Sequence, residues 1–328
     1  MVGVPPLAVV FFGTPEFAVP SLARLIASRH RVAAVVTQPD RPRGRGQRES
    51  HSPVKVLAVR HGIPVLQPER LKSDPFLSDL AAVRADLGVV AAYGRLLPDA
   101  VLATPRLGLI NVHASLLPRY RGAAPIQRAV MAGERETGVT ILRVVRELDA
   151  GPTFAMAARA IGPDETSDVI ERDLADIGAT LLLEVVEELA AGRAQESPQD
   201  ASRATYAPRV AKEDGLIHWD CPARVIHDQV RGLHPWPHAF TFLAGSRYIV
   251  LRAAVAMESR EKEQTAGAGP PPGTIVEARG DLLRASTGRG GLLDILEIQP
   301  EGRRSMTARA FLAGHPVARG AAFTAAAE

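Results

Sequence analysis

The chain has 328 residues, of which 46% are hydrophobic and 23% charged, so it is neither a disulfide-stapled miniprotein nor a disordered chain and has room for about two domains of roughly 150 residues. Its formal net charge of +3 neither requires nor excludes an anionic partner. The lone Cys221 excludes an internal disulfide and a thiolate metal site, and no apolar run approaches the ~18 residues of a membrane span, so we expect a cytoplasmic protein without a metal or a membrane anchor.

The first two hundred residues alternate apolar runs with segments of helical periodicity. This is the pattern of βα units around a mostly parallel sheet, and it predicts an α/β domain over residues 1–191. The expected strands are residues 7–12, 32–37, 87–91, 107–112 and 139–144.

Capping residues indicate where the helices begin. Thr14, Ser52 and Asp74 each place a side-chain oxygen before a proline, which favours the first turn of a helix, and Gly62 supplies a stop for the second of these helices. The longest helix is predicted over residues 167–191. Its apolar face is expected to consist of Ile170, Leu174, Ile177, Leu181, Val185 and Leu189.

The sequence pattern changes after residue 191. Residues 192–208 mix Gly, Pro, Ser, Gln and Asp without periodicity and are predicted to be a linker. Beyond them, residues 209–328 are predicted to form a smaller β-barrel or sheet domain with a short helix over 306–312 capped by Ser305. The strands expected there are residues 239–243, 248–254, 274–278 and 292–298.

The turn after the first predicted strand argues against a dinucleotide cofactor. It lacks the Gly-x-Gly-x-x-Gly pattern that lets a backbone approach a pyrophosphate. Pro15 removes an amide donor, and Glu16 would repel phosphate at a helix N-terminus. The domain can still be Rossmann-like, but we do not expect it to hold a nicotinamide or flavin dinucleotide.

Two polar residues at the end of an apolar strand are the first candidates for chemistry. Because a strand alternates its faces, Asn111 and His113 project to one side while Ile110 and Val112 face the other. They stand at the carboxyl end of the strand, where open α/β sheets form their ligand crevice. The alternative is that both side chains only satisfy backbone groups at the strand end.

Asp149 favours the functional interpretation. It lies in a loop-forming stretch directly after the predicted strand 139–144, from which its carboxylate can reach His113. Asn, His and Asp together can polarise a carbonyl, transfer a proton and orient an imidazole. Ser115 lacks the Gly-x-Ser-x-Gly context of a nucleophile. We therefore expect direct transfer between bound substrates, although the spacing does not identify the group transferred.

A basic loop over residues 39–52 is the second candidate site. Arg41, Arg43, Arg45 and Arg48 alternate there with Pro and Gly, in a loop too long and polar for a simple βα connection. Such guanidinium groups can bind phosphates or stack on bases. The alternative is a solvated charged loop.

Residues 111–127 carry a resemblance to a known family. They read Asn111-Val112-His113-Ala114-Ser115-Leu116-Leu117-Pro118-Arg119-Tyr120-Arg121-Gly122-Ala123-Ala124-Pro125-Ile126-Gln127. This stretch resembles the active-site signature of the 10-formyltetrahydrofolate-dependent formyltransferases, most closely of the members that act on methionyl-tRNA. The similarity covers nearly the whole chain and includes Phe11-Phe12-Gly13-Thr14-Pro15, Thr37-Gln38-Pro39-Asp40-Arg41-Pro42, Ser52-Pro53-Val54-Lys55, Ala92-Tyr93-Gly94, Leu148-Asp149-Ala150-Gly151 and His234-Pro235-Trp236-Pro237. Pro152 departs from the pattern, because some members carry a further Asp there.

The resemblance implies a fold and a reaction. It implies a Rossmann-like catalytic domain followed by an OB-like, tRNA-binding β-barrel. We expect a monomer, because the sequence has no long apolar edge and no coiled-coil repeat. The enzyme would transfer a formyl group from 10-formyltetrahydrofolate to the α-amino group of methionyl-initiator tRNA. Asn111 would donate to the oxyanion of the tetrahedral intermediate, His113 would stabilise it and move protons, and Asp149 would orient the imidazole.

The resemblance also implies binding residues. The folate donor would contact Ser115, Leu116, Leu117, Pro118 and Tyr93. The basic loop, above all Arg45, would contact the acceptor arm of the tRNA.

Two other functions stay open at this point. One is a folate-dependent formyltransferase or deformylase acting on a small molecule, which the same Asn, His and Asp would serve. The basic loop and the extra C-terminal domain count against it, because a small substrate needs neither. The other is a non-catalytic RNA-binding protein, which would transfer no formyl group.

Overall fold

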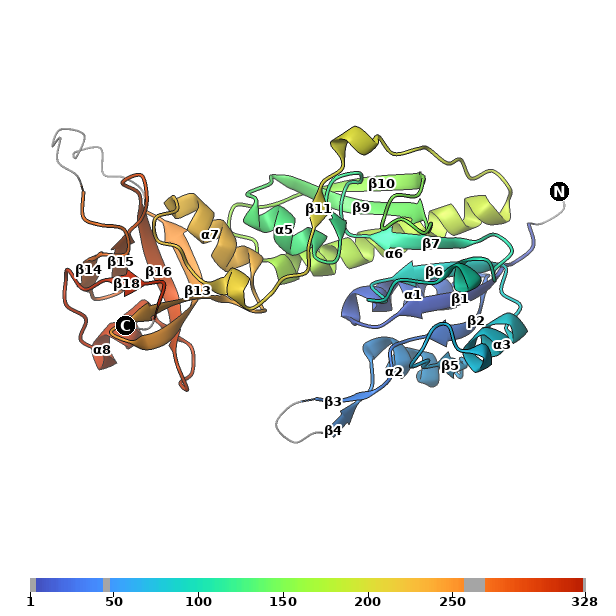
Figure 1. Cartoon of the computed structure of the whole chain (residues 1–328), viewed down its shortest axis with the longest axis horizontal. Coiled ribbons are helices and arrows are strands. Elements are labelled where there is room, and N and C mark those ends of the chain that lie inside the picture. Colours follow the sequence, from blue (N-terminus) through green and yellow to red (C-terminus); the bar gives the residue numbers. More distant parts are fainter. Residues whose placement is uncertain (1–3, 44–47, 257–268, 327–328) are drawn as a thin grey trace. The chain divides into compact units, whose positions relative to one another are not determined.

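Two compact units make up the chain in the computed structural model, which describes residues 4–43, 48–256 and 269–326 (Figure 1). The first unit comprises Met1–Pro125, Glu136–Ala160 and Ile170–Pro208. The second comprises Ile126–Arg135, Ile161–Val169 and Arg209–Glu328. Two short segments of the second unit are therefore inserted in the sequence of the first.

A seven-stranded sheet forms the centre of the first unit, in the order β10-β9-β7-β6-β1-β2-β5 (Figure 1). The five strands from β7 to β5 are parallel, while β9 and β10 are antiparallel additions to one edge. The predicted mostly parallel α/β architecture is confirmed. The strands are β1 (Ala8–Gly13), β2 (Arg31–Val36), β5 (Val65–Leu66), β6 (Leu87–Ala91), β7 (Leu109–His113), β9 (Glu136–Arg143) and β10 (Thr153–Ala160).

The burial of each strand explains why some strands could be predicted from the sequence and others could not. In β1, residues 9–13 are all buried, as expected for a central parallel strand covered on both faces. In β10, buried Thr153 is followed by half-buried and exposed residues, and the strand is rich in alanine, which favours strands little. All five predicted strands exist to within three residues at each end, and β5 and β10 were missed.

Of the three helix starts predicted in the first unit, one is observed as predicted, one is wrong and one differs by a residue. Ser52 caps α2 by accepting a hydrogen bond from the Lys55 amide, as predicted. After Thr14 the chain forms a 3-10 turn, η1, and the α-helix begins only at Val19, so an α-helix start at Thr14 is wrong. The third helix begins at Asp74 itself, with Ser73 at the N-cap. These elements are η1 (Glu16–Ala18), α1 (Val19–Ile26), α2 (Pro53–Arg60), α3 (Asp74–Ala82) and α4 (Asp99–Leu102). The next helix, α5 (Pro125–Met131), belongs to the second unit from Ile126 onward.

The longest helix, α6 (Ser167–Ala190), has nearly the predicted bounds but a rotated buried face. Leu182 and Val186 are fully buried, whereas the predicted Leu181 is only partly buried. The helix lies close to the sheet at Gly178, where an added Cβ would come within 2.8 Å of Val112 Cγ1. A helix that packs so closely behind β7 helps to fix the strand that carries Asn111 and His113.

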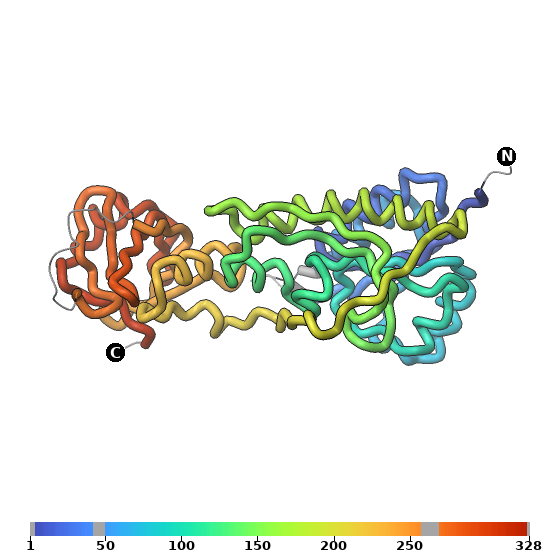
Figure 2. The backbone as a smooth tube through the Cα atoms, turned by 90° about the horizontal axis from the view of Figure 1, so that it is seen from above, coloured from blue at the N-terminus to red at the C-terminus, as the bar shows by residue number. Residues whose placement is uncertain are grey.

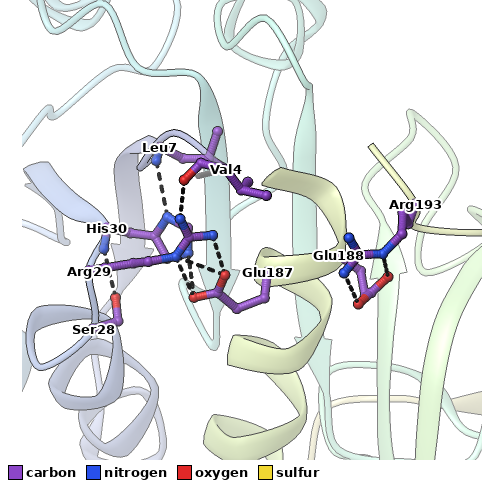
Figure 3. A network of polar contacts seen from close by, with 8 residues as sticks. All are labelled: Val4, Leu7, Ser28, Arg29, His30, Glu187, Glu188 and Arg193. Atoms are coloured by element: carbon purple, nitrogen blue, oxygen red, sulfur yellow. Dashed lines mark hydrogen bonds and ion pairs between the residues drawn. The ribbon is translucent and has the colours of Figure 1, made fainter. Parts of the chain in front are cut away.

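Polar contacts tie the C-terminal half of α6 to the turn between α1 and β2 (Figure 3). Arg29 pairs with Glu187, and the buried His30 ring accepts from the Leu7 amide at Nδ1 (3.0 Å) and contacts Glu187 through Nε2 (3.1 Å). A neutral ring with its hydrogen on Nε2 satisfies both contacts. Burial lowers the pKa of His30, which favours that neutral form.

The basic stretch forms a short hairpin in place of an open loop. Strands β3 (Arg41–Arg43) and β4 (Arg48–Ser50) pair antiparallel, with Arg43 opposite Arg48. At its base, Asp40 pairs with Lys55 and accepts from Gln67 Nε2 at 3.1 Å. The contact with Lys55 is the main reason that the pKa of Asp40 is lowered. The hairpin is thus anchored to the unit at the start of α2.

An antiparallel sheet forms the second unit, in the order β14-β15-β16-β13-β12-β18, with β17 paired to β16. Its core lies between the sheet and helices α7 and α8 and includes Trp219, Ile226 and Phe311. The elements are η3 (Glu213–Gly215), α7 (Ala223–Gly232), β12 (Ala239–Leu243), β13 (Ser246–Val255), β14 (Ile275–Arg279), β15 (Leu282–Ser286), β16 (Leu292–Pro300), β17 (Met306–Thr307), α8 (Ala308–Gly314) and β18 (Phe323–Thr324).

All four strands predicted for this unit are present, but the last helix begins later than expected. Met306 and Thr307 form β17, and α8 starts at Ala308 with Thr307, not Ser305, at its N-cap. The Thr307 hydroxyl accepts from the Ala310 amide. Sequence analysis missed α7, whose apolar face packs on the sheet.

Candidate functional site

The candidate site stands at the carboxyl end of β7. Strand β7 lies beside β6, and β6 lies beside β1, where the strand order reverses. Asn111 and His113 occupy the last three positions of β7 together with Val112, which faces the other side of the sheet and lies against Gly178 of α6. Such an edge near a switch in strand order is where open α/β sheets bind ligands.

Asp149 joins these two residues across the sheet edge. Its Oδ2 lies 3.6 Å from His113 Nδ1, and its Oδ1 lies 3.5 Å from Asn111 Nδ2. The carboxylate also accepts a 2.9 Å hydrogen bond from the Gly122 amide. The Asp149 backbone has φ 50°, a left-handed conformation that is uncommon outside glycine. The structure therefore brings the three residues singled out in the sequence into one cluster.

The His113 ring is oriented from both sides. Its Nε2 lies 2.9 Å from the carbonyl oxygen of Tyr120, so the neutral ring places its hydrogen on Nε2. Nδ1 faces Asp149 at a distance longer than a hydrogen bond. The ring is 5% exposed. It is thus held in one orientation, with Nδ1 as the nitrogen that is free to exchange a proton.

Sequence analysis missed the segment that supports this cluster. Residues 197–207, which we call the strap, run back from α6 along the loop after β7 (Figure 2). Strand β11 (Tyr206–Ala207) pairs with β8 (Arg121–Gly122), and η2 (Ala201–Arg203) precedes it. Gln199 contacts the Asp149 loop. The strap lies within the residues predicted as a linker, whose lack of periodicity carried no signal for these contacts.

The residues predicted to bind folate fall into two groups. Ser115 and Leu117 are buried, and both are held by Thr140, whose hydroxyl donates to the Ser115 carbonyl (2.7 Å) and accepts from the Leu117 amide (3.2 Å). The Ser115 hydroxyl donates to the Arg119 carbonyl. Leu116 and Pro118 are partly exposed. Only the second pair presents side-chain surface, so the predicted contacts at Ser115 and Leu117 would involve the backbone.

Tyr93 is built into the core beside this edge. Its ring is 1% exposed and packs edge-to-face on Phe12, with 5.7 Å between ring centroids. Burial raises the pKa of its phenol, an effect that Arg95 opposes. Its carbonyl already accepts from Gln38 Nε2 at 2.8 Å. The structure therefore shows Tyr93 as a packing residue, and its folate contact stays a prediction.

The predicted arginines lie on the β3–β4 hairpin. Arg41 is exposed, and the backbones of Arg43 and Arg48 lie opposite each other in the two paired strands. Arg45 lies outside the described residues. The structure thus places the backbone of three of the four arginines, and their contact with RNA stays a prediction.

Within residues 4–43, 48–256 and 269–326, no group of three or more His, Cys, Asp or Glu is arranged to hold a metal ion. In the same part of the chain, no helix is long and apolar enough to cross a membrane.

Comparison with known proteins identifies the family. The formyl transferase family profile matches residues 7–186, and the profile of the formyl transferase C-terminal domain matches residues 209–316. A methionyl-tRNA formyltransferase of Heliobacterium modesticaldum is 44% identical over 97% of this chain and 100% of its own length. The chain belongs to the methionyl-tRNA formyltransferase family.

Other members of the methionyl-tRNA formyltransferase family match equally well. The relative from Moorella thermoacetica is 46% identical over 96% of this chain and 98% of its own length. The one from Methylococcus capsulatus is 46% identical over 95% of this chain and 98% of its own length. Because these similarities extend over both units, they support an enzyme that acts on methionyl-tRNA over the small-molecule and non-catalytic alternatives.

Solved structures share the fold of this methionyl-tRNA formyltransferase family member at low sequence identity. WlaRD, a sugar 3N-formyl transferase crystallised with dTDP and 5-N-formyl-THF, superposes with a TM-score of 0.66 at 16% identity, over 92% of this chain and 100% of its own. HypX from Aquifex aeolicus, crystallised with tetrahydrofolic acid, gives 0.63 at 17% identity, over 94% of this chain and 47% of its own.

Proposed function

We propose that this chain transfers the formyl group of 10-formyltetrahydrofolate to the α-amino group of methionyl-initiator tRNA, with Asn111, His113 and Asp149 as catalytic residues. The observation that carries the proposal is the convergence of these three side chains at the carboxyl end of β7, where Asp149 lies 3.6 Å from His113 and 3.5 Å from Asn111. Family membership supports the reaction and both substrates.

The chemistry follows from what each group can donate. The lone pair of the α-amino nitrogen attacks the formyl carbon, the C=O bond becomes an oxyanion, and the bond from carbon to N10 of the folate then breaks. Asn111 Nδ2 donates to the oxyanion, which stabilises charge that exists only along the reaction path. An α-amino group has a pKa near ~8 in model peptides, so a useful fraction is already neutral without a strong base.

Proton transfer falls to His113. Its Nδ1 accepts the proton that the attacking amine loses and returns a proton to N10 as that nitrogen leaves. Asp149 stabilises the imidazolium that exists between these steps, and the Tyr120 carbonyl keeps the ring from turning away. The formyl group ends on the amine and the proton on the folate, so charge and atoms balance.

The donor would be held next to this cluster. We infer that Leu116 and Pro118 contact the folate through their side chains, that Ser115 and Leu117 contact it through the backbone, and that Tyr93 shapes the wall from behind. Thr140 supports this interpretation because it fixes the 115–117 backbone by two hydrogen bonds. Folate compounds bound to proteins of the same fold support the choice of ligand.

The acceptor would be held by the β3–β4 hairpin. We infer that Arg41, Arg43, Arg45 and Arg48 contact the acceptor arm, since guanidinium groups pair with phosphates. The anchoring of the hairpin through Asp40 and Lys55 supports a defined position for these contacts. We further infer that the second unit is an OB-like barrel that contacts tRNA, and that the enzyme acts as a cytoplasmic monomer in translation initiation.

The test is formylation of initiator methionyl-tRNA with 10-formyltetrahydrofolate, followed by mass spectrometry of the released aminoacyl group, with elongator methionyl-tRNA as the comparison. Asn111→Ala should lower kcat by ~10²-fold or more, as does loss of an oxyanion donor elsewhere. His113→Ala should also lower kcat by ~10²-fold or more. Near-normal turnover by a folded variant would overturn the assignment of that residue.

A further inference from the structure

The strap is hydrogen-bonded to β10 at its start and to residues 118–124, which follow β7, at its end. Ser197 exchanges two backbone hydrogen bonds with Thr153 of β10, at 2.8 and 2.9 Å. Further along, the Thr205 carbonyl accepts from the Arg121 amide (2.8 Å), and the Thr205 hydroxyl accepts from the Tyr120 amide (2.8 Å). The segment is therefore part of the catalytic unit, fixed by contacts at both ends.

Gln199 lies between these two ends and uses its whole side-chain amide. Its Nε2 donates to the carbonyls of Asp149 (2.8 Å) and Gly151 (2.7 Å). Its Oε1 accepts from Arg121 Nε (3.1 Å) and Nη2 (2.7 Å). Two donors and two acceptor positions are all that a Gln amide has. Its orientation is also fixed, because the opposite one would turn Oε1 toward two carbonyl oxygens.

The partners of Gln199 are the two segments that set the Asp149 carboxylate. On one side is the backbone of Asp149 itself, whose φ of 50° needs support from its surroundings. On the other side is Arg121, which is 7% exposed and precedes Gly122, the residue whose amide donates to Asp149 Oδ2 at 2.9 Å. One side chain thus links the backbone from which the carboxylate projects to the strand that supplies its hydrogen-bond donor.

We propose that Gln199 is a positioning residue for the catalytic carboxylate of Asp149, and through it for His113; this rests on the proposed function. Loss of its amide frees the Asp149 loop and Arg121 to move independently, so the contact with His113 Nδ1 lengthens. A displacement of about 1 Å at a reacting group can cost ~10²-fold in rate. Gln199 touches neither substrate in this scheme, so its effect falls on kcat.

Two variants separate its contacts. Gln199→Ala removes all four hydrogen bonds. Gln199→Glu keeps an acceptor for Arg121 but turns a carboxylate oxygen toward the carbonyls of Asp149 and Gly151. We expect both variants to lower kcat by about 10- to 100-fold and to leave KM for each substrate within about threefold. Gln195→Ala, at an exposed glutamine four residues earlier, is the control and should keep the parent kcat.

A double-mutant cycle with Asp149→Ala shows whether Gln199 acts through Asp149. Single-turnover formylation is measured for the parent, both single variants and the double variant, with a thermal melt of each. We expect Gln199→Ala to lower the rate no further once Asp149 is absent. Full activity of Gln199→Ala, or an undiminished effect in the Asp149→Ala background, would overturn the positioning role. If the parent formylates methionyl-tRNA and Asp149→Ala does not, the proposed function is supported, whatever Gln199→Ala does. The proposed function and the positioning role of Gln199 can therefore fail separately.

Discussion

Asp228 carries a buried negative charge whose removal we expect to be costly for stability. It lies on α7, is 3% exposed, and accepts from Arg231 Nε at 2.7 Å and from Arg224 Nε at 3.2 Å. Arg231 is itself 4% exposed. The substitution Asp228→Asn keeps the shape of the side chain and removes its charge. It leaves the Arg231 guanidinium buried without a counter-ion.

The geometry gives the size of the effect. Loss of one partner from a buried ion pair costs about 3–5 kcal/mol, because the remaining charge stays desolvated. Arg231 keeps its hydrogen bonds to the carbonyls of Gly162 and Glu165, and asparagine can still accept from it, so we expect the lower end, about 3 kcal/mol. For a cooperative unit of this size, that corresponds to a Tm lower by about 6–12 °C.

Thermal unfolding followed by circular dichroism, supported by urea titration, tests this expectation. The matched control is Asp281→Asn, which removes the acid of an exposed pair with Arg309 (73% and 77% exposed, 3.4 Å apart) and should leave Tm unchanged. If Asp228→Asn were no more destabilising than Asp281→Asn, the argument from burial would be refuted.

Acid pH should remove the difference between Asp228→Asn and the parent. Burial alone would raise the pKa of Asp228, but its contacts with His227 and Arg231 and the charges of Arg231 and Arg224 outweigh burial, so its pKa lies below its ordinary value. A carboxylate with a lowered folded-state pKa stabilises the protein above its unfolded pKa of ~3.9 and loses this contribution as pH falls through the folded value. The gap in stability should therefore be constant near neutrality and close below about pH 4.

Three further predictions concern the first unit. Gly122→Ala should lower kcat at least tenfold in the formylation assay, because Gly122 has φ 122° and an added Cβ would lie 2.7 Å from the Ala207 carbonyl oxygen. Unchanged turnover would mean that the strap can move away from the new methyl group without disturbing the site. Arg41→Ala should raise KM for tRNA, leave KM for the folate unchanged, and make the log K against log [salt] slope shallower by about one; an unaltered slope would make the hairpin a solvated loop. Glu187→Gln should lower the free energy of unfolding at neutral pH, chiefly because it removes the contact with Arg29 that lowers the pKa of Glu187. Below the pKa that Glu187 has in the folded protein, the substitution should have no effect. Equal destabilisation at neutral and at acid pH would contradict an ionic origin of the effect.

Regular periodicity was enough to predict much of the fold. The strand Leu87–Ala91 was predicted with its observed bounds, because a short apolar run between polar segments is typical of a buried strand. The same alternation placed Asn111 and His113 on one face, where the structure has them. The buried face of α6 was harder, since apolar residues occur on several sides of the helix and close packing at Gly178 decides which side faces the sheet.

Contacts made by irregular segments could not be predicted. The Tyr120 carbonyl that holds His113 and the Gln199 amide that holds the Asp149 loop depend on where two loops meet, and neither carries a local sequence signal. The start of α1 shows the same limit: Thr14 has the right chemistry for a cap, but its hydroxyl donates to the carbonyl of Tyr93, in the segment that follows the neighbouring strand β6. Tertiary contacts decided these positions.

The second unit cannot be excised by a single cut. Its residues 126–135 and 161–169 lie at least 40 positions before Arg209 in the sequence. A fragment that begins at Arg209 would lack Asp164, whose Oδ1 lies 3.0 Å from the buried His227, and the carbonyls of Gly162 and Glu165 that accept from Arg231. Truncation and gene fusion at residue 208 would therefore yield an unstable fragment with its buried charges exposed, whereas grafting the two inserted segments with it keeps this unit whole.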